Sequence, residues 1–214
     1  VHNVETLYWV AKICREGPEC LNATEKNGRT GLRSYSVSGR VRSPGVKLAP
    51  AGITARELLE EYAGGMPSGH QFVAYLPGGA SGGILPASKA DLPLDFGALE
   101  PHGCFVGSHA VIYLSDQDDL KAAALNLMRF FEDESCGYCT PCRVGNVLLR
   151  ESLQRVRSGK AEPQDLKHME SLGASVKTTS RCGLGQTSPN PILSSLENFR
   201  HLYEERVAEV VNQA

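Results

Sequence analysis

The sequence predicts an α+β protein with a strand-rich middle region and a helical C-terminal region. Between residues 34 and 115, apolar and polar residues alternate in short runs bounded by glycine and proline, which is typical of strands. From residue 116 to residue 214, apolar residues recur every three or four positions, which is typical of helices that bury one face. One short helical segment lies inside the strand-rich region, so the predicted class is α+β rather than all-β.

The first element is a helix over residues 3–15, where apolar residues follow helical spacing. Asn3 is suited to cap its first turn, and Glu5 places a negative charge near the positive helix end. The segment that follows is polar and rich in glycine, which predicts a loop. Residues 1–33 are therefore interpreted as a helix and a linker.

The strand-rich region begins with SYSVSGRV, which alternates, and with SPGV, which predicts a turn and hence a hairpin. In TARELLEEYAGG, Thr54 and Glu57 form a capping box, while Gly64 and Gly65 end the helix. QFVAYL predicts a further strand, and CFVGSHAVIYL predicts one or two more. A hairpin, one helix across it and further strands predict a small β-grasp domain over residues 34–115.

The helical region predicts four helices. Asp118 and Asp119 open the first, Pro141 precedes the second, the third spans about residues 163–172, and the last follows Pro191. The residues expected on the inner faces of the first, second and last helices are Leu120, Ala124, Leu127, Phe131, Leu149, Leu153, Val156, Leu193, Leu196, Phe199, Tyr203, Val207 and Val210. Short connections between such helices predict a four-helix bundle over residues 116–214.

Composition excludes several classes of function. The net charge is −2, with 41% hydrophobic and 21% charged residues, and no Lys/Arg run suggests a nucleic-acid partner. No apolar stretch reaches the roughly 18 residues of a membrane span. Seven cysteines without a secretion signal favour a reducing, cytoplasmic location and a metal site over disulfides. Cys14, Cys20 and Cys104 show no ligand-like spacing.

The motif ESCGYCTPCRVG places Cys136, Cys139 and Cys142 at three-residue intervals. Pro141 is suited to the first turn of a helix, so Cys142 is expected where free backbone N–H groups favour an anionic ligand cage. The fourth candidate ligand is Cys182, in TTSRCGLGQTSPNP. A triplet with one remote cysteine favours a [4Fe–4S] cluster. A four-cysteine zinc site, or cysteines without a ligand, remain alternatives.

These motifs resemble the family of flavin-bearing, NADH-oxidising subunits of respiratory complex I. The family includes the diaphorase subunits of NAD-reducing hydrogenases and the β-subunits of NAD-dependent, molybdenum- or tungsten-containing formate dehydrogenases. ESCGYCTPCRVG resembles the family's cluster motif, and RCGLGQTSPNP resembles the loop of its fourth ligand. The form CGLGQ is closer to the hydrogenase and formate dehydrogenase branch, and GGASGGILPASKADLPLDFGALEPHGCFVGS resembles the formate dehydrogenase β-subunit most. The resemblance implies that the four cysteines are ligands, not nucleophiles.

The segment VHNVETL resembles the family's VNNVETL motif, which closes over FMN at the end of a preceding flavin domain. His2 departs from the asparagine usual at its position. A capped helix start explains Asn3 equally well without a flavin. The resemblance implies FMN contacts by Val1, Asn3 and Thr6 at the start of the chain, and places Leu184 and Gly185, just past the last cysteine, between the cluster and the flavin.

By resemblance, residues 1–33 are the end of a flavin domain, residues 34–115 a soluble-ligand-binding β-grasp domain, and residues 116–214 the helical cluster-binding domain. The family's Gly-rich FMN and NADH loop has no equivalent here, because GGASGG carries Ala80 where GxGxxG requires glycine. The chain is therefore expected to be the C-terminal part of a split or truncated subunit. Alone, it is not expected to oxidise or reduce NAD.

The implied function is electron transfer within a multisubunit, NAD-dependent oxidoreductase. In a formate dehydrogenase, electrons from formate oxidation at a metal–pterin centre would pass through the [4Fe–4S] cluster to FMN and then NAD. The implied partners are a flavin-domain polypeptide, a molybdopterin-containing catalytic subunit and a small [2Fe–2S] subunit. The alternatives are a hydrogenase diaphorase or complex I subunit and, from another class, a zinc-stapled interaction module without a redox role.

Overall fold

The computed structural model describes residues 1–22 and 24–211, with side chains described as far as residue 207. The N-terminal part forms α1 (Val4–Glu16), α2 (Glu19–Asn22) and a small hairpin of β1 (Glu25–Lys26) and β2 (Arg29–Thr30). Asn3 caps α1 as expected, because its side chain accepts a hydrogen bond from the Glu5 N–H at 2.8 Å. The hairpin and α2 form within the segment that the sequence predicted as a loop.

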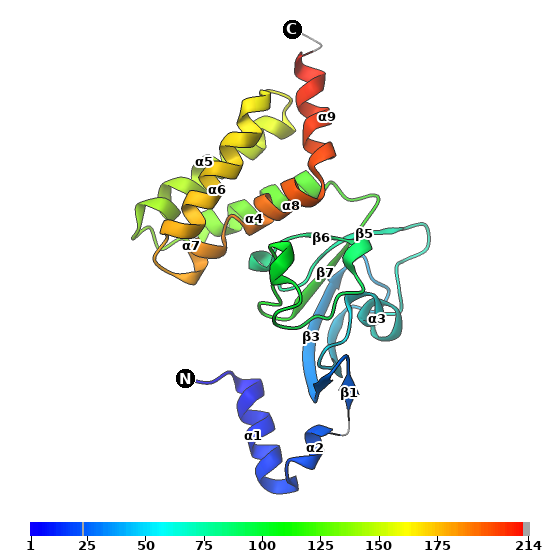
Figure 1. The fold of residues 1–214 in the computed structure, drawn as a ribbon. Helices are drawn as coiled ribbons and strands as arrows, with labels where there is room; N and C mark the ends of the chain where they lie inside the picture. Colours follow the sequence, from blue (N-terminus) through cyan, green and yellow to red (C-terminus); the bar gives the residue numbers. More distant parts are fainter. Residues whose placement is uncertain (23, 212–214) are drawn as a thin grey trace.

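A five-stranded sheet forms the middle of the molecule. Its strands are β3 (Leu32–Gly39), β4 (Gly45–Pro50), β5 (Phe72–Leu76), β6 (Leu85–Pro86) and β7 (Ala110–Ser115). The order is β4-β3-β7-β5-β6, and the central β3–β7 pair is parallel while the others are antiparallel. The sheet lies between the N-terminal helices and the C-terminal helices (Figure 1). The predicted hairpin is the β3–β4 pair.

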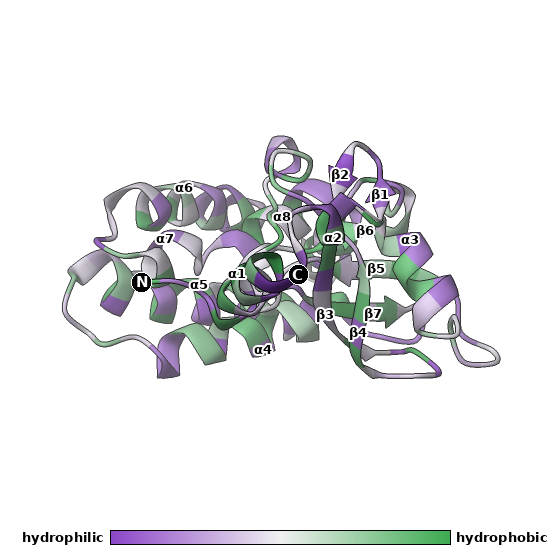
Figure 2. Ribbon diagram, turned by 90° about the horizontal axis from the view of Figure 1, so that it is seen from below, coloured by the Kyte–Doolittle hydropathy of each residue, from purple (hydrophilic) through white to green (hydrophobic). Residues whose placement is uncertain are grey.

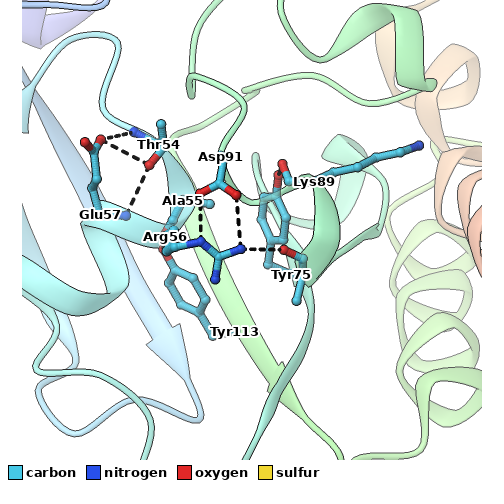
Figure 3. Close-up of polar contacts among 9 residues, drawn as sticks. Thr54, Ala55, Arg56, Glu57, Tyr75, Lys89, Asp91 and Tyr113 are labelled. Atoms are coloured by element: carbon cyan, nitrogen blue, oxygen red, sulfur yellow. Dashed lines mark hydrogen bonds and ion pairs between the residues drawn. The ribbon is translucent and has the colours of Figure 1, made fainter.

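One helical segment packs on this sheet. It comprises α3 (Ala55–Glu57) and a π-helical turn at Leu58–Tyr62, and both hydrogen bonds of the predicted Thr54–Glu57 capping box are present (Figure 3). The buried Tyr113 hydroxyl donates to the Ala55 carbonyl oxygen at 2.7 Å, which ties the central strand to the helix start. This hydrogen bond satisfies a buried hydroxyl that would otherwise be costly to bury.

The segment CFVGSHAVIYL contributes one strand, β7, rather than two. Its first part, around the buried Cys104 and Val106, is a loop that follows short 3₁₀ turns. These turns are Ala80–Gly82, Ala87–Lys89 and Glu100–His102. The α+β class is confirmed: a mixed sheet precedes a helical region.

The C-terminal helices are α4 (Leu120–Asp133), α5 (Thr140–Arg157), α6 (Pro163–Thr179), α7 (Gly183–Thr187), α8 (Asn190–Asn198) and α9 (Arg200–Val211). Leu149, Leu153 and Val156 of α5 are buried as predicted. Hydrophobic residues lie along α4 and β7 (Figure 2), where the helical core meets the sheet. Among the helices of the described residues, none has the length and apolarity needed to cross a bilayer.

The predicted stripe of α4 packs on the core, with Leu127 half-buried against it, and Leu125 and Met128 are buried beside it. Two other expectations for these helices need correction. The third helix continues to Thr179 instead of ending near residue 172. The predicted last helix is two helices, because Phe199 leaves helical geometry at φ −134° and ψ 33°.

The division at Phe199 coincides with a contact between the end of α8 and a segment distant in the sequence. The Asn198 amide donates to the carbonyl oxygens of Ser194 and Ile84, at 2.8 Å and 3.3 Å, and so fixes the end of α8 against the sheet region. The chain then turns, and Tyr203 and Val207 of α9 are buried as predicted. Leu193 is half-buried, and the Val210 side chain lies outside the described residues.

Candidate metal centre

The cysteine triplet lies between the end of α4 and the start of α5. Helix α4 ends at Asp133, and Cys139 is the N-cap of α5. Pro141 lies in the first turn of α5, as its fixed φ favours, and Gly137 has φ +73° in the turn before it. Cys142, in that same first turn, is buried, whereas Cys136 is exposed and Cys139 is half-buried.

The thiol of Cys142 is held by two neutral side chains. Its Sγ lies 3.2 Å from Ser135 Oγ and 3.4 Å from Asn146 Nδ2. Ser135 Oγ also accepts a hydrogen bond from the Gly137 N–H at 3.2 Å. Hydrogen-bond donors that face a sulfur stabilise negative charge on it, which is how iron–sulfur proteins tune their clusters.

The remote segment with Cys182 packs against this loop. The pKa of the Cys139 thiol is lowered, first by a hydrogen bond from the Arg181 backbone N–H and then by one from the Cys142 N–H. The Arg181 guanidinium also lies over the Tyr138 ring, 5.1 Å from its centroid. Residue 181 therefore contacts the triplet loop, although thirty-nine residues separate Cys142 from Cys182.

Cys182 is exposed and is the N-cap of the short helix α7. The sequence predicted a loop here, yet Gly183–Thr187 is helical and α8 begins at Asn190. Gly185 lies in tight contact with α5, because a Cβ built on it would be 3.1 Å from Cys142 Cβ and 2.6 Å from Ser180. The Ser180 hydroxyl is buried and has no hydrogen-bond partner among the described residues.

The four predicted ligands come from two adjoining segments, but their sulfurs are not gathered. In the part of the chain that the structure describes, no three or more His, Cys, Asp or Glu residues form a metal-binding group. The donor set nevertheless suits a cluster: it consists of cysteines, with backbone and side-chain donors at two sulfurs and an orphaned hydroxyl beside them. Ligation by Cys136, Cys139, Cys142 and Cys182 stays a prediction.

The remaining cysteines stand apart from this centre. Cys104 is 1% exposed, and burial raises the pKa of its thiol to about 12, which suits an inert core residue. Cys14 is exposed and Cys20 is half-buried. Of the acidic residues before the triplet, Glu132 pairs with Arg150, while Asp133 and Glu134 are exposed.

The residues expected near FMN border two clefts. Asn3 and Thr6 line a cleft of about 680 Å³ between α1 and the sheet, while Val1 is fully exposed. Leu184 lines a second cleft, of about 490 Å³, between α7, α4 and loops of the sheet region. Ser108 lines both clefts, so they adjoin. Gly185 is buried behind Leu184 against α5.

Sequence reasoning missed the side chains that surround Cys142. Asn146 stands four residues after Cys142, and positions i and i+4 of a helix share a face, so this spacing could have identified it. Ser188 meets Asn146 only because α7 packs on α5, and no local pattern predicts that contact.

Residues 122–206 match the family described as NADH-ubiquinone oxidoreductase-F iron-sulfur binding region. The chain is 35% identical over 207 residues to the NADP-reducing hydrogenase protein HndC of Solidesulfovibrio fructosivorans, covering 97% of this chain and 42% of that protein. It is 34% identical over 212 residues to the F subunit of the NADH-quinone oxidoreductase of Escherichia coli (strain K12), covering 98% of this chain and 47% of that protein.

Among solved structures, the chain matches the crystal structure of an NAD⁺-reducing [NiFe]-hydrogenase in the H₂-reduced state with a TM-score of 0.85 and 30% identity. That match covers 97% of this chain and 35% of the hydrogenase chain, so here too this chain spans less than half of its relative. Residues 122–206 therefore match the NADH-ubiquinone oxidoreductase-F iron–sulfur binding region, and the chain over nearly its whole length is similar to the F subunit of NADH-quinone oxidoreductase and to the hydrogenase protein HndC.

Proposed function

We propose that this chain is the electron-transfer part of an NAD-linked, multisubunit oxidoreductase, in which Cys136, Cys139, Cys142 and Cys182 hold one [4Fe–4S] cluster. The observation that carries the proposal is the contact between Arg181 and the triplet loop, in which the guanidinium lies over the Tyr138 ring and 3.4 Å from its hydroxyl. This contact brings the remote cysteine segment to the triplet, as a shared cluster requires. The match of residues 122–206 to an iron–sulfur binding family supports the same assignment.

When bound, a [4Fe–4S] cluster accepts and releases single electrons. The chain's own residues hold and tune it. The four thiolates supply the ligands, and the backbone N–H groups at the start of α5 and at Arg181 stabilise negative charge on the sulfurs. Cys142 is buried, while Cys136 and Cys182 lie near the surface, where a second redox centre can approach.

The flavin and NAD are proposed to bind mainly to a flavin-domain polypeptide, with this chain closing one side. Val1, Asn3 and Thr6 at α1, and Leu184 and Gly185 at α7, are the proposed FMN contacts. Their clefts adjoin at Ser108, which supports a single ligand or domain between the two helices. Helix α1 has no buried residue and exposes Leu7, so its apolar face is available to such a domain.

The proposed domains follow the predicted division at residues 33 and 115. The strand order β4-β3-β7-β5-β6, with its parallel central pair and one helical segment, supports a β-grasp domain related to soluble-ligand-binding modules. The helices after residue 116 supply the cluster site. The longer helices α4, α5 and α6 support a helical bundle. The short α7, and the presence of α8 and α9 in place of one last helix, depart from a simple four-helix bundle.

For the whole complex we propose a cytoplasmic formate dehydrogenase, with this chain as part of its β-subunit. The support is the resemblance of residues 78–108 to that subunit. Its partners would be the flavin-domain polypeptide, a molybdopterin-containing subunit that oxidises formate and a small [2Fe–2S] subunit. A hydrogenase diaphorase is the second candidate, because HndC and an NAD⁺-reducing [NiFe]-hydrogenase are among the relatives.

The cluster is tested by purifying the chain with its partners under anaerobic conditions. We expect a brown protein with about four irons per cluster-bearing chain. Cys182→Ser is expected to lose most of that iron, while Cys14→Ser, at an exposed cysteine far from the triplet in sequence, keeps it. A colourless protein with one zinc would replace this proposal with a zinc-stapled interaction module.

The identity of the complex is tested by the polypeptides that co-purify. A molybdopterin-containing subunit and formate-dependent NAD reduction would support formate dehydrogenase. A nickel–iron subunit and hydrogen-dependent reduction would instead establish the hydrogenase diaphorase.

A further inference from the structure

Asn146 is a fully buried polar side chain in the first half of α5. Its Nδ2 donates to Cys142 Sγ at 3.4 Å and to the Phe131 carbonyl oxygen at 3.3 Å. Its Oδ1 accepts a hydrogen bond from Ser188 Oγ at 2.6 Å. One side chain therefore joins the end of α4, the cysteine in the first turn of α5, and the segment just after α7.

Stability of the helix does not require asparagine at this position. Asparagine is a weaker helix former than leucine, and burying an amide is costly unless all its groups are hydrogen-bonded. Here both the amide and the carbonyl of Asn146 are satisfied, and so is Ser188, which is also fully buried. A polar network that is complete in this way favours one arrangement of the elements that it joins.

The network also sets the position of the remote cysteine segment. Ser188 Oγ lies 3.1 Å from the Gly185 carbonyl oxygen, and Gly185 packs against Cys142. Helix α7 begins immediately after Cys182. The hydrogen bond from Ser188 to Asn146 thus anchors the C-terminal end of α7 on the helix that carries Cys142.

We propose that Asn146 is a positioning residue of the iron–sulfur centre, with two separable effects; this inference rests on the cluster proposed above. Its amide donates to Cys142 Sγ and stabilises the more negative, reduced cluster, which raises the reduction potential. Its carbonyl group accepts from Ser188 and holds α7, with Cys182 at its start, against α5.

Ser135 is the other neutral group at Cys142 Sγ, and it differs in what it connects. It lies in the loop between α4 and α5, where its hydroxyl also accepts from the Gly137 N–H. Ser135 can therefore affect the sulfur, but it has no contact with α7 among the described residues. Of the two side chains at Cys142 Sγ, Asn146 is the one that also bonds to the segment after Cys182, through Ser188.

The test compares Asn146→Leu with Asn190→Leu in the purified complex. Asn190 is a matched control: it is 3% exposed, its amide donates to the Ser81 carbonyl oxygen, and its Oδ1 accepts from Lys177, with no sulfur contact. We expect Asn146→Leu to shift the one-electron equilibrium of the cluster about tenfold toward the oxidised form. This corresponds to a reduction potential about 59 mV more negative than that of the wild type. Asn190→Leu is expected to leave the potential unchanged in the same redox titration.

Ser188→Ala separates the two effects. It removes the anchor of α7 and keeps the donor at Cys142, so the potential should stay at the wild-type value. Amide hydrogen exchange over residues 183–188 should rise in Ser188→Ala and in Asn146→Leu, but not in Asn190→Leu. Exchange over residues 147–156 of α5 serves as the internal reference.

If Asn146→Leu and wild type have the same reduction potential, the effect of the amide on the cluster is overturned. If their amide exchange over residues 183–188 is the same, the anchoring effect on α7 is overturned. Should Asn146→Leu fail to retain iron, Ser188→Ala and the exchange measurement decide the anchoring effect, and unchanged exchange overturns the proposal. Failure of the proposed function looks different, because the wild-type chain would then hold no iron–sulfur cluster. The exchange comparison would still test the anchor in that case.

Discussion

The guanidinium of Arg181 lies over the ring of Tyr138, with 5.1 Å between the Arg181 Cζ and the ring centroid. Arg181 Nη1 is also 3.4 Å from the Tyr138 hydroxyl. Tyr138 stands between the first two cysteines of the triplet, and Arg181 immediately precedes Cys182. This contact therefore closes the two cysteine segments on each other at the surface, outside the buried contacts of Cys142.

Removing the Tyr138 ring is expected to loosen this closure. An exposed cation–π contact contributes about 0.5–1 kcal/mol, so Tyr138→Leu should release cluster iron to a chelator about two- to fivefold faster. Tyr138→Phe keeps the ring and loses only a long hydrogen bond, so it should behave as wild type. If both variants released iron at the wild-type rate, the stacked pair would have no part in retaining the cluster.

Gly185 is expected to tolerate no side chain. A Cβ at this position would lie 2.6 Å from both Cβ and Oγ of Ser180 and 3.1 Å from Cys142 Cβ, so α7 would have to move. Overpacking of this kind costs about 1–3 kcal/mol. Gly185→Ala should therefore lower both the melting temperature and the iron content per chain.

Gly183 provides the matched control for this substitution. It lies in the same short helix, and nothing is within 4 Å of a Cβ built on it, so Gly183→Ala should leave iron content and melting temperature close to wild type. Adding Ser180→Gly to Gly185→Ala should restore part of the loss, because it removes the nearest obstructing atoms. Equal behaviour of the two alanine variants would show that the close approach is not a constraint.

Local sequence signals predicted the local structure well. Asn3, the Thr54–Glu57 pair and Asp119 cap helices as expected, because a cap depends on residues within one turn. The division of the last helix was not predictable in this way. Apolar spacing continues through Phe199 without a proline or glycine, and the break depends on Asn198 reaching the Ile84 carbonyl oxygen, far away in the sequence.

The candidate site shows the same limit. The spacing of the triplet and Pro141 predicted a cysteine in the first turn of α5, and the structure has it there. Cysteine spacing, and then resemblance to a family, suggested that the Cys182 segment approaches the triplet, but the contact of Arg181 with Tyr138 depends on how α6, α7 and α5 pack and was not predicted. The hydrogen bond from Ser188 to Asn146 crosses the same interface, and a single sequence contains no signal for such a pair.

Asp95 is expected to link stability to pH. The residue is 3% exposed and accepts hydrogen bonds from Arg29 and, at 2.8 Å, from Arg33 Nη1. These contacts tie the β1–β2 hairpin and β3 to the loop that follows the 3₁₀ turn at Ala87–Lys89. Asp95→Asn should therefore lower the free energy of unfolding at neutral pH by about 1.5–3 kcal/mol, as measured by urea denaturation.

The pH dependence of that loss follows from the carboxyl group. Burial by itself raises the pKa of Asp95, but hydrogen bonds, first from Arg29 and then from the Phe96 N–H and from Arg33, hold this pKa below its ordinary value of 3.8. The unfolded chain therefore takes up the proton first, so the stabilisation is complete above pH 3.8 and is lost as pH falls through the lower, folded-state pKa. The difference in unfolding free energy between wild type and Asp95→Asn should accordingly stay constant down to about pH 4. Below that pH the difference should shrink toward zero. Asp91 pairs with Arg56 at an exposed site, so Asp91→Asn should change the unfolding midpoint little at any pH. A difference that persisted unchanged in acid would mean that Asp95 stabilises the fold through its shape and not through its charge.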